Sequence, residues 1–184
     1  MQRNIIVPAG IGEAGLAEMK QWLGITRNSE DVLLAGLLEA ALDLCEAFTG
    51  QMPLQQTVEE TLPARGGQQR LGTRPVRSII SAETLGDDGG RTPIDESAYS
   101  ARIAACGTAT ITLQQPLEGS AIIVRMLAGI APDWASLPPA LRQGIIRLGA
   151  HHYRDRDADG QRHPAPPPAS VTALWRPWRL MRLT

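Results

Sequence analysis

The sequence predicts an α+β protein that is mainly α: a small helical bundle with an inserted antiparallel β region and a C-terminal helical arm. Apolar residues recur at helical spacing in three stretches, residues 13–23, 30–49 and 139–156. Between the second and the third, residues 54–130 change to short alternating segments separated by turn signals, which is typical of antiparallel strands. A last apolar and aromatic stretch, residues 170–184, follows a proline-rich segment and predicts the arm.

The first two helices have predicted ends. Gly24 and Gly50 each follow the last apolar residue of a helical stretch, where a left-handed residue ends a helix. Asn28 or Ser29 is predicted to cap the second helix. The predicted buried faces are Leu16, Met19, Trp22 and Leu23 in the first helix, and Val32, Leu33, Leu37, Ala41, Leu44 and Phe48 in the second.

The remaining elements follow from proline and glycine signals. Pro138 and Pro139 stand at the start of the third helix, where a missing backbone N–H costs nothing. Asp88 and Gly89 lie between two alternating runs and predict a hairpin turn. We count five or six short strands in the β region, which predicts an antiparallel sheet or a small sandwich.

The length and composition fit one body with an appended arm. The chain has 184 residues, of which 43% are hydrophobic and 20% charged, so it has enough apolar residues to bury a core. We predict a body of residues 1–158, a proline-rich linker of residues 159–169 and the arm of residues 170–184. The thirteen residues from Arg156 to Pro168 span roughly 40 Å if they are extended at about 3.1 Å per residue.

The charge is unevenly distributed along the chain. The net charge of -1 argues against a general nucleic-acid binder. Residues 1–139 nevertheless hold 10 Lys and Arg against 16 Asp and Glu, whereas residues 140–184 hold 8 against 3. A basic C-terminal piece on an acidic body suggests that the tail meets an acidic partner or another copy of the chain. The alternative is that these arginines lie at helix ends and in the tail, where Arg is common, and bind no partner.

The two cysteines do not form a recognisable site. Cys45 lies in an apolar helical run and Cys106 among small residues in a strand region, and neither has a CxxC partner. Two buried free thiols in a reducing compartment are the predicted outcome. No apolar run reaches the length of a membrane span, and the N-terminus has no signal-peptide pattern. These observations predict a protein that is made in the cytoplasm.

The pair His151 and His152 invites a metal or acid–base interpretation. Adjacent residues on a helix point about 100° apart, so the two rings do not face one ion from the same side. His151 and Asp155 share a face but make a poor metal site alone. We favour a structural role at the helix end, where the dipole favours His. No nucleophile elbow or phosphate loop occurs either, so the sequence predicts no enzyme, no metal and no cofactor.

The arm is the strongest candidate for a binding surface. It carries the residue types that are enriched in interface hot spots: Trp175, Arg176, Trp178, Arg179 and Arg182. A helix this short is not stable alone and must dock on something. It docks either on its own core or on another molecule, and we favour the second because the linker gives it reach. A further alternative is a nucleic-acid-binding module, in which the tryptophans stack on single-stranded bases.

The order of several short motifs resembles a known family. These are EAFTG at residues 46–50, the pattern P-x-L-x-x-x-I-x-x-L-x-x-x-x-Y-x-x-R from Pro139 to Arg156, and ALWRPWR at residues 173–179. The chain resembles the head–tail connector, or adaptor, proteins of long-tailed bacteriophages and of phage-like gene transfer agents. The resemblance runs from about Leu16 to Leu183, with a longer proline linker here and no residue-level match in the middle strands.

The resemblance implies a structural role without catalytic residues. It implies a homo-oligomeric ring of about 12 copies below the portal protein, in the neck of a virion or particle that assembles in the host cytoplasm. Double-stranded DNA would pass through this ring without sequence specificity, and a tail stopper or tail-completion protein would follow below. The arm would engage the portal through Trp175, Arg176, Trp178, Arg179 and Arg182.

Overall fold

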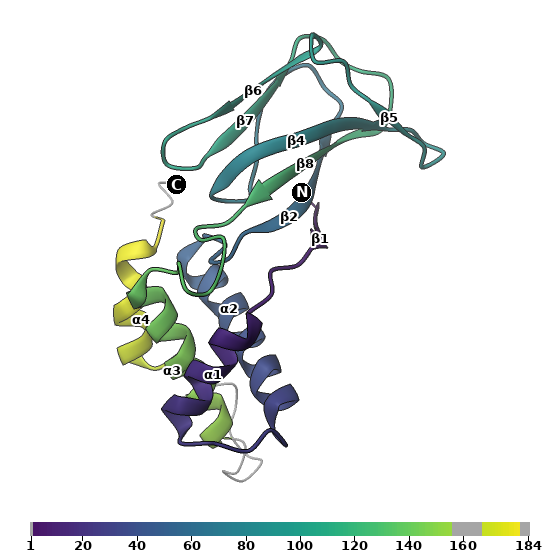
Figure 1. Cartoon of the computed structure of the whole chain (residues 1–184). Coiled ribbons are helices and arrows are strands. Elements are labelled where there is room, and N and C mark those ends of the chain that lie inside the picture. Colours follow the sequence, from purple (N-terminus) through teal and green to yellow (C-terminus); the bar gives the residue numbers. More distant parts are fainter. Residues whose placement is uncertain (1, 156–166, 181–184) are drawn as a thin grey trace. The chain divides into compact units, whose positions relative to one another are not determined.

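The computed structural model describes residues 2–155 and 167–180, and these divide into two compact units (Figure 1). The β unit contains residues 1–9 and 55–130, and the helical unit contains residues 10–54 and 131–184. The chain therefore passes between the units three times, after Ala9, Leu54 and Ile130. Most of the predicted linker, residues 159–166, lies outside the described residues.

The prediction of a mainly helical protein is wrong. In the described part of the chain, helix makes up 35% and strand 30%, with the strands in two antiparallel sheets. The β region is inserted between the second and third long helices, as predicted, but it is a compact unit with a core of its own. Helical periodicity stands out in long segments, whereas eight short strands give weaker signals that are easily undercounted.

The β unit consists of two sheets. The five-stranded sheet has the order β1-β2-β8-β4-β5, and the three-stranded sheet has the order β3-β7-β6. The strands are β1 (Gln2–Val7), β2 (Gln56–Pro63), β3 (Gly67–Arg70), β4 (Val76–Leu85), β5 (Arg91–Pro93), β6 (Tyr99–Ile103), β7 (Ala109–Leu113) and β8 (Ala121–Ala128). The predicted turn at Asp88 and Gly89 joins β4 to β5.

Strand β8 is the centre of the larger sheet. Its sequence AIIVRMLA is almost continuously apolar, which is typical of a strand covered on both faces. It pairs with β2 on one side, through Val58 and Met126, and with β4 on the other, through Ile79 and Met126. The core of the unit is formed by Val58, Leu62, Leu71, Val76, Ala82, Ile111, Leu113, Ile122, Val124 and Met126.

The sequence did not predict β1. This strand pairs antiparallel with β2, with Ile5 opposite Val58 and a bulge between Ile5 and Val7. All six of its residues are exposed, so it lacks the alternation of buried and exposed positions that identifies a strand in a sequence. Strand β1 brings the N-terminal residues into a sheet whose other strands follow residue 55.

The helical unit is built from α1 (Gly12–Leu23), α2 (Asp31–Thr49), α3 (Pro139–Asp155), α4 (Ala169–Trp175) and the short 3-10 helix η1 (Arg176–Trp178). Gly24 and Gly50 end α1 and α2 in the left-handed conformation, with φ of 73° and 72°, as predicted. The predicted cap on α2 is wrong, because Glu30 occupies the cap position and makes no side-chain cap bond. Within the described residues, no helix is long and apolar enough to cross a membrane.

The buried face of α2 differs from the predicted one. The buried residues are Leu34, Leu38, Ala41, Cys45 and Thr49. Of the predicted stripe, Val32 is 90% exposed, and Leu33 and Leu44 are exposed as well. Apolar side chains surround most of this helix, so periodicity alone did not identify the face that meets α3.

Glycines in α3 allow close contact with its neighbours. A Cβ on Gly144 would lie 2.2 Å from Trp175 Nε1, and one on Gly149 would lie 3.2 Å from Met19 Cε. Both glycines are buried in the helix interior, where glycine normally costs stability. Here the missing side chains make room for a tryptophan from α4 and a methionine from α1.

Candidate docking surfaces and polar clusters

Trp175 is part of the protein's own core. Its side chain is fully buried, and its indole Nε1–H donates to the Leu141 carbonyl oxygen at 3.3 Å. Its ring lies over Gly144, and the Phe48 ring centroid is 6.0 Å away. Val171, one turn earlier, is 1% exposed. The described part of the arm thus docks on the helices of its own chain, and Trp175 is not available for stacking on bases.

The end of the described arm is more exposed than Trp175. The Leu180 N–H donates to the Thr49 carbonyl at 3.0 Å, and the Gln51 side-chain amide donates to the Trp178 carbonyl at 2.6 Å. The guanidinium of Arg179 lies 5.4 Å from the centre of the Phe48 ring. Trp178 is half-buried, whereas Arg176 and Arg179 are exposed. Arg182 lies outside the described residues.

The two histidines sit at the end of α3. His151 Nε2 lies 3.2 Å from an Asp155 carboxylate oxygen, one turn along the helix. Partial burial lowers the pKa of His152, and the neighbouring His151 lowers it further. Tyr153 donates its hydroxyl to Glu30 at 2.7 Å and ties α3 to the start of α2. Among the described residues, no group of three or more His, Cys, Asp or Glu side chains could hold a metal ion.

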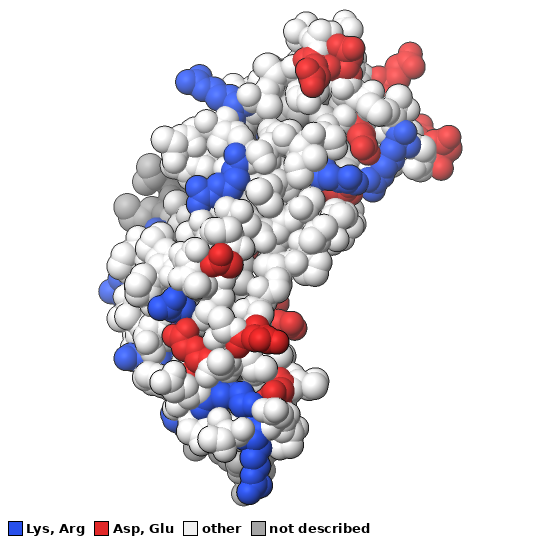
Figure 2. All heavy atoms as spheres, viewed as in Figure 1, with Lys and Arg blue, Asp and Glu red and all other residues white. Residues whose placement is uncertain are grey.

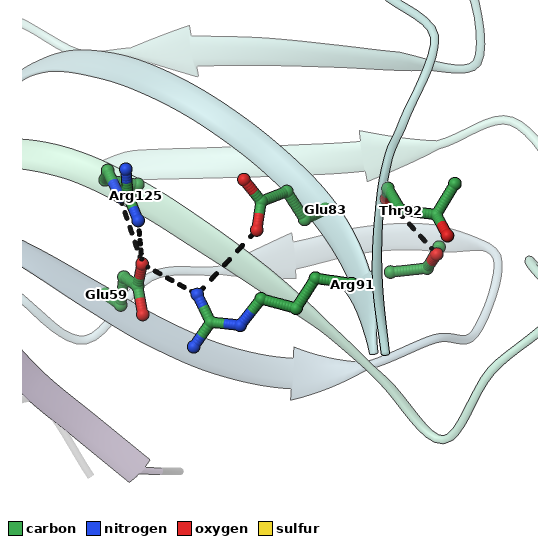
Figure 3. A network of polar contacts seen from close by, with 6 residues as sticks. Glu59, Glu83, Arg91, Thr92 and Arg125 are labelled. Carbon is green, nitrogen blue, oxygen red and sulfur yellow. Dashed lines mark hydrogen bonds and ion pairs between the residues drawn. The ribbon is translucent and has the colours of Figure 1, made fainter. Parts of the chain in front are cut away.

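A network of charged residues lies on the larger sheet (Figure 3). The Glu59 carboxylate on β2 accepts hydrogen bonds from Arg125 on β8, at 2.7 and 3.0 Å, and from Arg91 on β5, at 3.0 Å. Arg91 also lies 3.7 Å from Glu83 on β4. No pattern in the sequence indicates this network, because its members are far apart along the chain and meet only after the strands pair.

The network makes stability depend on pH. Burial alone would raise the pKa of Glu59, but the hydrogen bonds and charges of Arg91 and Arg125 outweigh it and hold the pKa below 4.5. A carboxyl whose pKa is lower in the folded state stabilises the fold above its unfolded pKa. That contribution is lost as the pH falls through the folded pKa.

We therefore expect Glu59→Gln to lower the free energy of unfolding at neutral pH. The difference from the wild type should shrink as the pH falls from the unfolded-state pKa of this carboxyl to its lower folded-state pKa, because protonation then removes the same charge that the substitution removes. Urea unfolding over a pH series measures this difference. Glu83→Gln is the matched control and should have a smaller effect. A difference that stays constant with pH would contradict the assignment.

The neighbouring Glu60 holds a loop. It is 1% exposed, and its carboxylate accepts hydrogen bonds from the Gly72 N–H at 2.7 Å, the Thr73 N–H at 3.0 Å and the Thr73 hydroxyl at 3.0 Å. Residues on either side of this loop bond to the smaller sheet. The Leu71 N–H donates to the Ala109 carbonyl, and the Val76 N–H donates to the Gly107 carbonyl. Glu60 thus fixes the segment that connects the two sheets.

The cysteines differ in their surroundings. Cys45 is fully buried in α2, and burial raises the pKa of its thiol to about 12. The prediction that Cys106 is also buried is wrong: it lies exposed in the turn between β6 and β7. A hydrogen bond with the Thr108 hydroxyl lowers the pKa of the Cys106 thiol.

A thiol reagent should therefore modify one cysteine in the native protein. We expect rapid labelling of Cys106 and labelling of Cys45 only after unfolding, because the thiolate is the reactive form and needs access. Titration with a chromogenic disulfide, with and without denaturant, measures both. The Cys106→Ser variant should show no native labelling, and fast labelling of that variant would contradict the burial of Cys45.

Acidic side chains gather at the β4–β5 end of the β unit (Figure 2). The exposed members are Asp87, Asp88, Asp95, Glu96 and Glu118. A hollow of about 570 Å³ lies here between the β4–β5 hairpin and the turn before β8, and Asp88, Asp95 and Glu118 contribute to its lining. The described residues that line the hollow include no Lys or Arg, so their charge does not favour a phosphate group.

Several large apolar side chains are exposed. In the helical unit these are Trp22, Val32, Leu33 and Leu44, and in the β unit they are Ile5, Ile6, Val7, Ile80 and Ile103. Trp22 was predicted to be buried, but it is 44% exposed with the Arg147 guanidinium 5.7 Å from its ring centre. Exposed apolar groups of this size are typical of surfaces that meet another protein.

Comparison with known proteins gives a consistent result. The model of the family described as phage gp6-like head-tail connector protein matches residues 13–66, which cover α1, α2 and β2. No curated protein sequence matches the chain. Solved structures do, and three of them are similar over the full length.

Three similar structures are of gene transfer agent (GTA) particles. A chain in the neck of an empty GTA particle, computed with C6 symmetry, has a TM-score of 0.79 and 23% identity. Chains in the native GTA virion and in the native neck computed with C12 symmetry each have a TM-score of 0.78 and 22% identity. Each alignment covers 100% of this chain and 98% of the other.

At this identity the structural similarity establishes the fold. The family model adds a sequence match over the first two helices and the strand that follows them. The resemblance to head–tail connector proteins predicted from the sequence is therefore confirmed by the family model for residues 13–66, and the whole chain shares its fold with the GTA neck chain.

Proposed function

We propose that this chain is a structural head–tail connector that forms a ring in the neck of a phage or gene transfer agent particle. The observation that carries the proposal is the similarity of the whole chain to a neck chain, with 100% and 98% coverage and a TM-score of 0.79. Necks of such particles were computed with C6 and C12 symmetry, which supports a cyclic homo-oligomer. The ring contributes position and shape, and it needs no chemistry.

In this proposal double-stranded DNA passes through the ring. Each phosphate that a cation neutralises adds affinity, and therefore drag, so a passage gains from weak attraction. The excess of acidic residues in residues 1–139, 16 against 10, is compatible with such a passage. The proposed neighbours are the portal protein on one side and a tail stopper or tail-completion protein on the other.

We place the portal contact on the exposed end of the arm. Arg176 and Arg179 are exposed and Trp178 is half-buried, and the predicted Arg182 follows them outside the described residues. Trp175 holds this surface in position, because its burial fixes α4 on α3. Arginine suits the role, since it pairs in a bidentate manner with carboxylates of a partner.

Complementation in cells that lack the gene tests the function. Without the chain we expect DNA-filled heads that carry no tails, and the wild-type chain should restore tailed particles. Electron micrographs of purified particles measure the tailed fraction. Tailed particles in normal numbers without the chain would contradict the proposal.

A double substitution tests the portal contact. Arg176→Glu with Arg179→Glu should reduce attachment to heads while leaving the buried contacts of Trp175 intact. The matched control is Arg27→Glu with Arg154→Glu, which changes two exposed arginines of the same unit by the same charge. Normal attachment by the first variant, or equal loss in both, would contradict the assignment. Deleting the arm is a poorer test, because it removes Trp175 from the core.

A further inference from the structure

Strand β1 is an exposed edge strand. It occupies one end of the five-stranded sheet, and all six of its residues are exposed. Ile5, Ile6 and Val7 are 44%, 39% and 57% exposed. These three adjacent apolar side chains lie at the bulge of β1. An edge strand is a template for another strand, and proteins usually shield it.

The chemistry of this edge specifies what covers it. A row of backbone N–H and C=O groups is matched by another extended backbone, as in recognition by strand addition. The cyclic ring proposed above supplies that backbone, because each copy has a neighbour on either side. If β1 paired with β1 of a second copy, the contact would be two-fold symmetric and would close at a dimer. A ring requires β1 to meet a different surface of the next copy.

The β unit offers three other strand edges among its described residues. Strand β5 has three residues and includes Pro93, which has no N–H to donate. Strand β3 has four residues and begins at Gly67. Strand β6 has five residues without proline, and Ser100 to Ile103 are all exposed. Strand β6 therefore matches the six-residue β1 best in length and in bonding capacity.

The positions of β1 and β6 suit a head-to-tail contact. Strand β6 is the last strand of the three-stranded sheet; among the described strands its hydrogen-bonded partner is β7, and it also lies near β4. Figure 1 shows β1 and β6 on opposite sides of the β unit. Ile103 on β6 is 38% exposed and supplies an apolar side chain that contact with β1 would bury. One copy therefore carries both halves of a repeating contact.

We infer that β1 of one copy pairs with β6 of the next copy and so joins the larger sheet of one chain to the smaller sheet of its neighbour. This inference rests on the proposed ring. It assigns the subunit contact to the β unit and leaves the arm for the portal.

Cross-linking on purified particles tests the pairing. In a Cys106→Ser background, Ile6→Cys and Ala101→Cys place one exposed thiol on each strand, while Cys45 stays buried. After treatment with a short bis-maleimide, denaturing gels of the double variant should show dimers, trimers and higher species. Each single variant should stay monomeric. A double variant that is incorporated normally but gives no ladder would overturn the inference, as would dimers of the Ile6→Cys variant alone.

A pair of charged substitutions provides an independent test. Ile6→Lys should abolish incorporation of the chain, because it puts a charge into the shared sheet. Purified particles should then contain no more of the chain than particles from cells that lack the gene. Ile80→Lys is the matched control, since Ile80 is 54% exposed on β4 of the same unit, and it should be incorporated normally. Normal incorporation of Ile6→Lys would overturn the inference. Absence of the wild-type chain from particles would instead overturn the proposed function.

Discussion

Replacing Trp175 with alanine should destabilise the helical unit by about 3–5 kcal/mol, the usual cost of removing a fully buried tryptophan. The side chain fills the space over Gly144, contacts Phe48 and donates to the Leu141 carbonyl. Its loss leaves a cavity and frees α4, a seven-residue helix that is too short to be stable alone. Equilibrium urea unfolding followed by circular dichroism measures the change.

The control for this substitution is Trp178→Ala. Trp178 is half-buried, so its removal should cost much less. Equal effects of the two substitutions would contradict a core role for Trp175. If the Trp175→Ala variant does not fold well enough to measure, Gly144→Ala probes the same contact.

Two glycine substitutions check the contact from the other side. A Cβ on Gly144 would overlap Trp175 Nε1, so Gly144→Ala should be destabilising. Gly36 lies inside α2, and a Cβ added there would meet nothing within 4 Å, so Gly36→Ala should stabilise by roughly 1 kcal/mol through helix propensity. The same chemical change thus has opposite signs in the two helices. Stabilisation by both would show that Trp175 does not pack on Gly144.

The second large effect is expected at Glu60. Glu60→Gln should destabilise the β unit by about 2–4 kcal/mol, because a buried donor left without an acceptor costs about 1–3 kcal/mol. The glutamine amide keeps one acceptor oxygen, so its NH₂ group faces either the Gly72 N–H or the Thr73 N–H and leaves that donor without an acceptor. Urea unfolding measures the total loss, and hydrogen exchange at Leu71 and Val76 reports the loosening of the loop.

Thr73→Val separates the parts of this contact. It removes the hydroxyl that donates to Glu60 and keeps the backbone N–H, so it should cost about 1 kcal/mol. If Thr73→Val costs as much as Glu60→Gln, the backbone bonds contribute little, and the role assigned to the carboxylate is wrong.

The sequence located the long helices well. Helices predicted at 13–23, 30–49 and 139–156 are observed at Gly12–Leu23, Asp31–Thr49 and Pro139–Asp155. Glycine and proline signals mark their ends, and these signals act locally. The buried face of α2 was not predictable, because Val32 and Leu33 are as apolar as Leu34 and Leu38. Contact with the neighbouring helices, chiefly α3, decides which of them is covered.

The polar clusters and strand β1 were not predicted from the sequence, for a different reason. Glu59, Arg91 and Arg125 come from three strands, and their meeting depends on the register with which those strands pair. Trp175 was identified as a binding residue on composition alone. Its burial depends on the gap at Gly144, which no local pattern reveals. Local sequence signals therefore predicted where the helices begin and end. They did not predict contacts between residues that are far apart in the sequence.

The three passages of the chain between the units have a mechanical consequence. A pull on either unit is shared among the backbone segments at residues 9–10, 54–55 and 130–131, so no single covalent link carries the full load. Two of these segments are also joined by the hydrogen bond from the Ala131 N–H to the Pro53 carbonyl. A protease that cuts one segment leaves the units tethered by two others. Separation of the two units would require three cuts, whereas two domains joined by a single linker are separated by one cut.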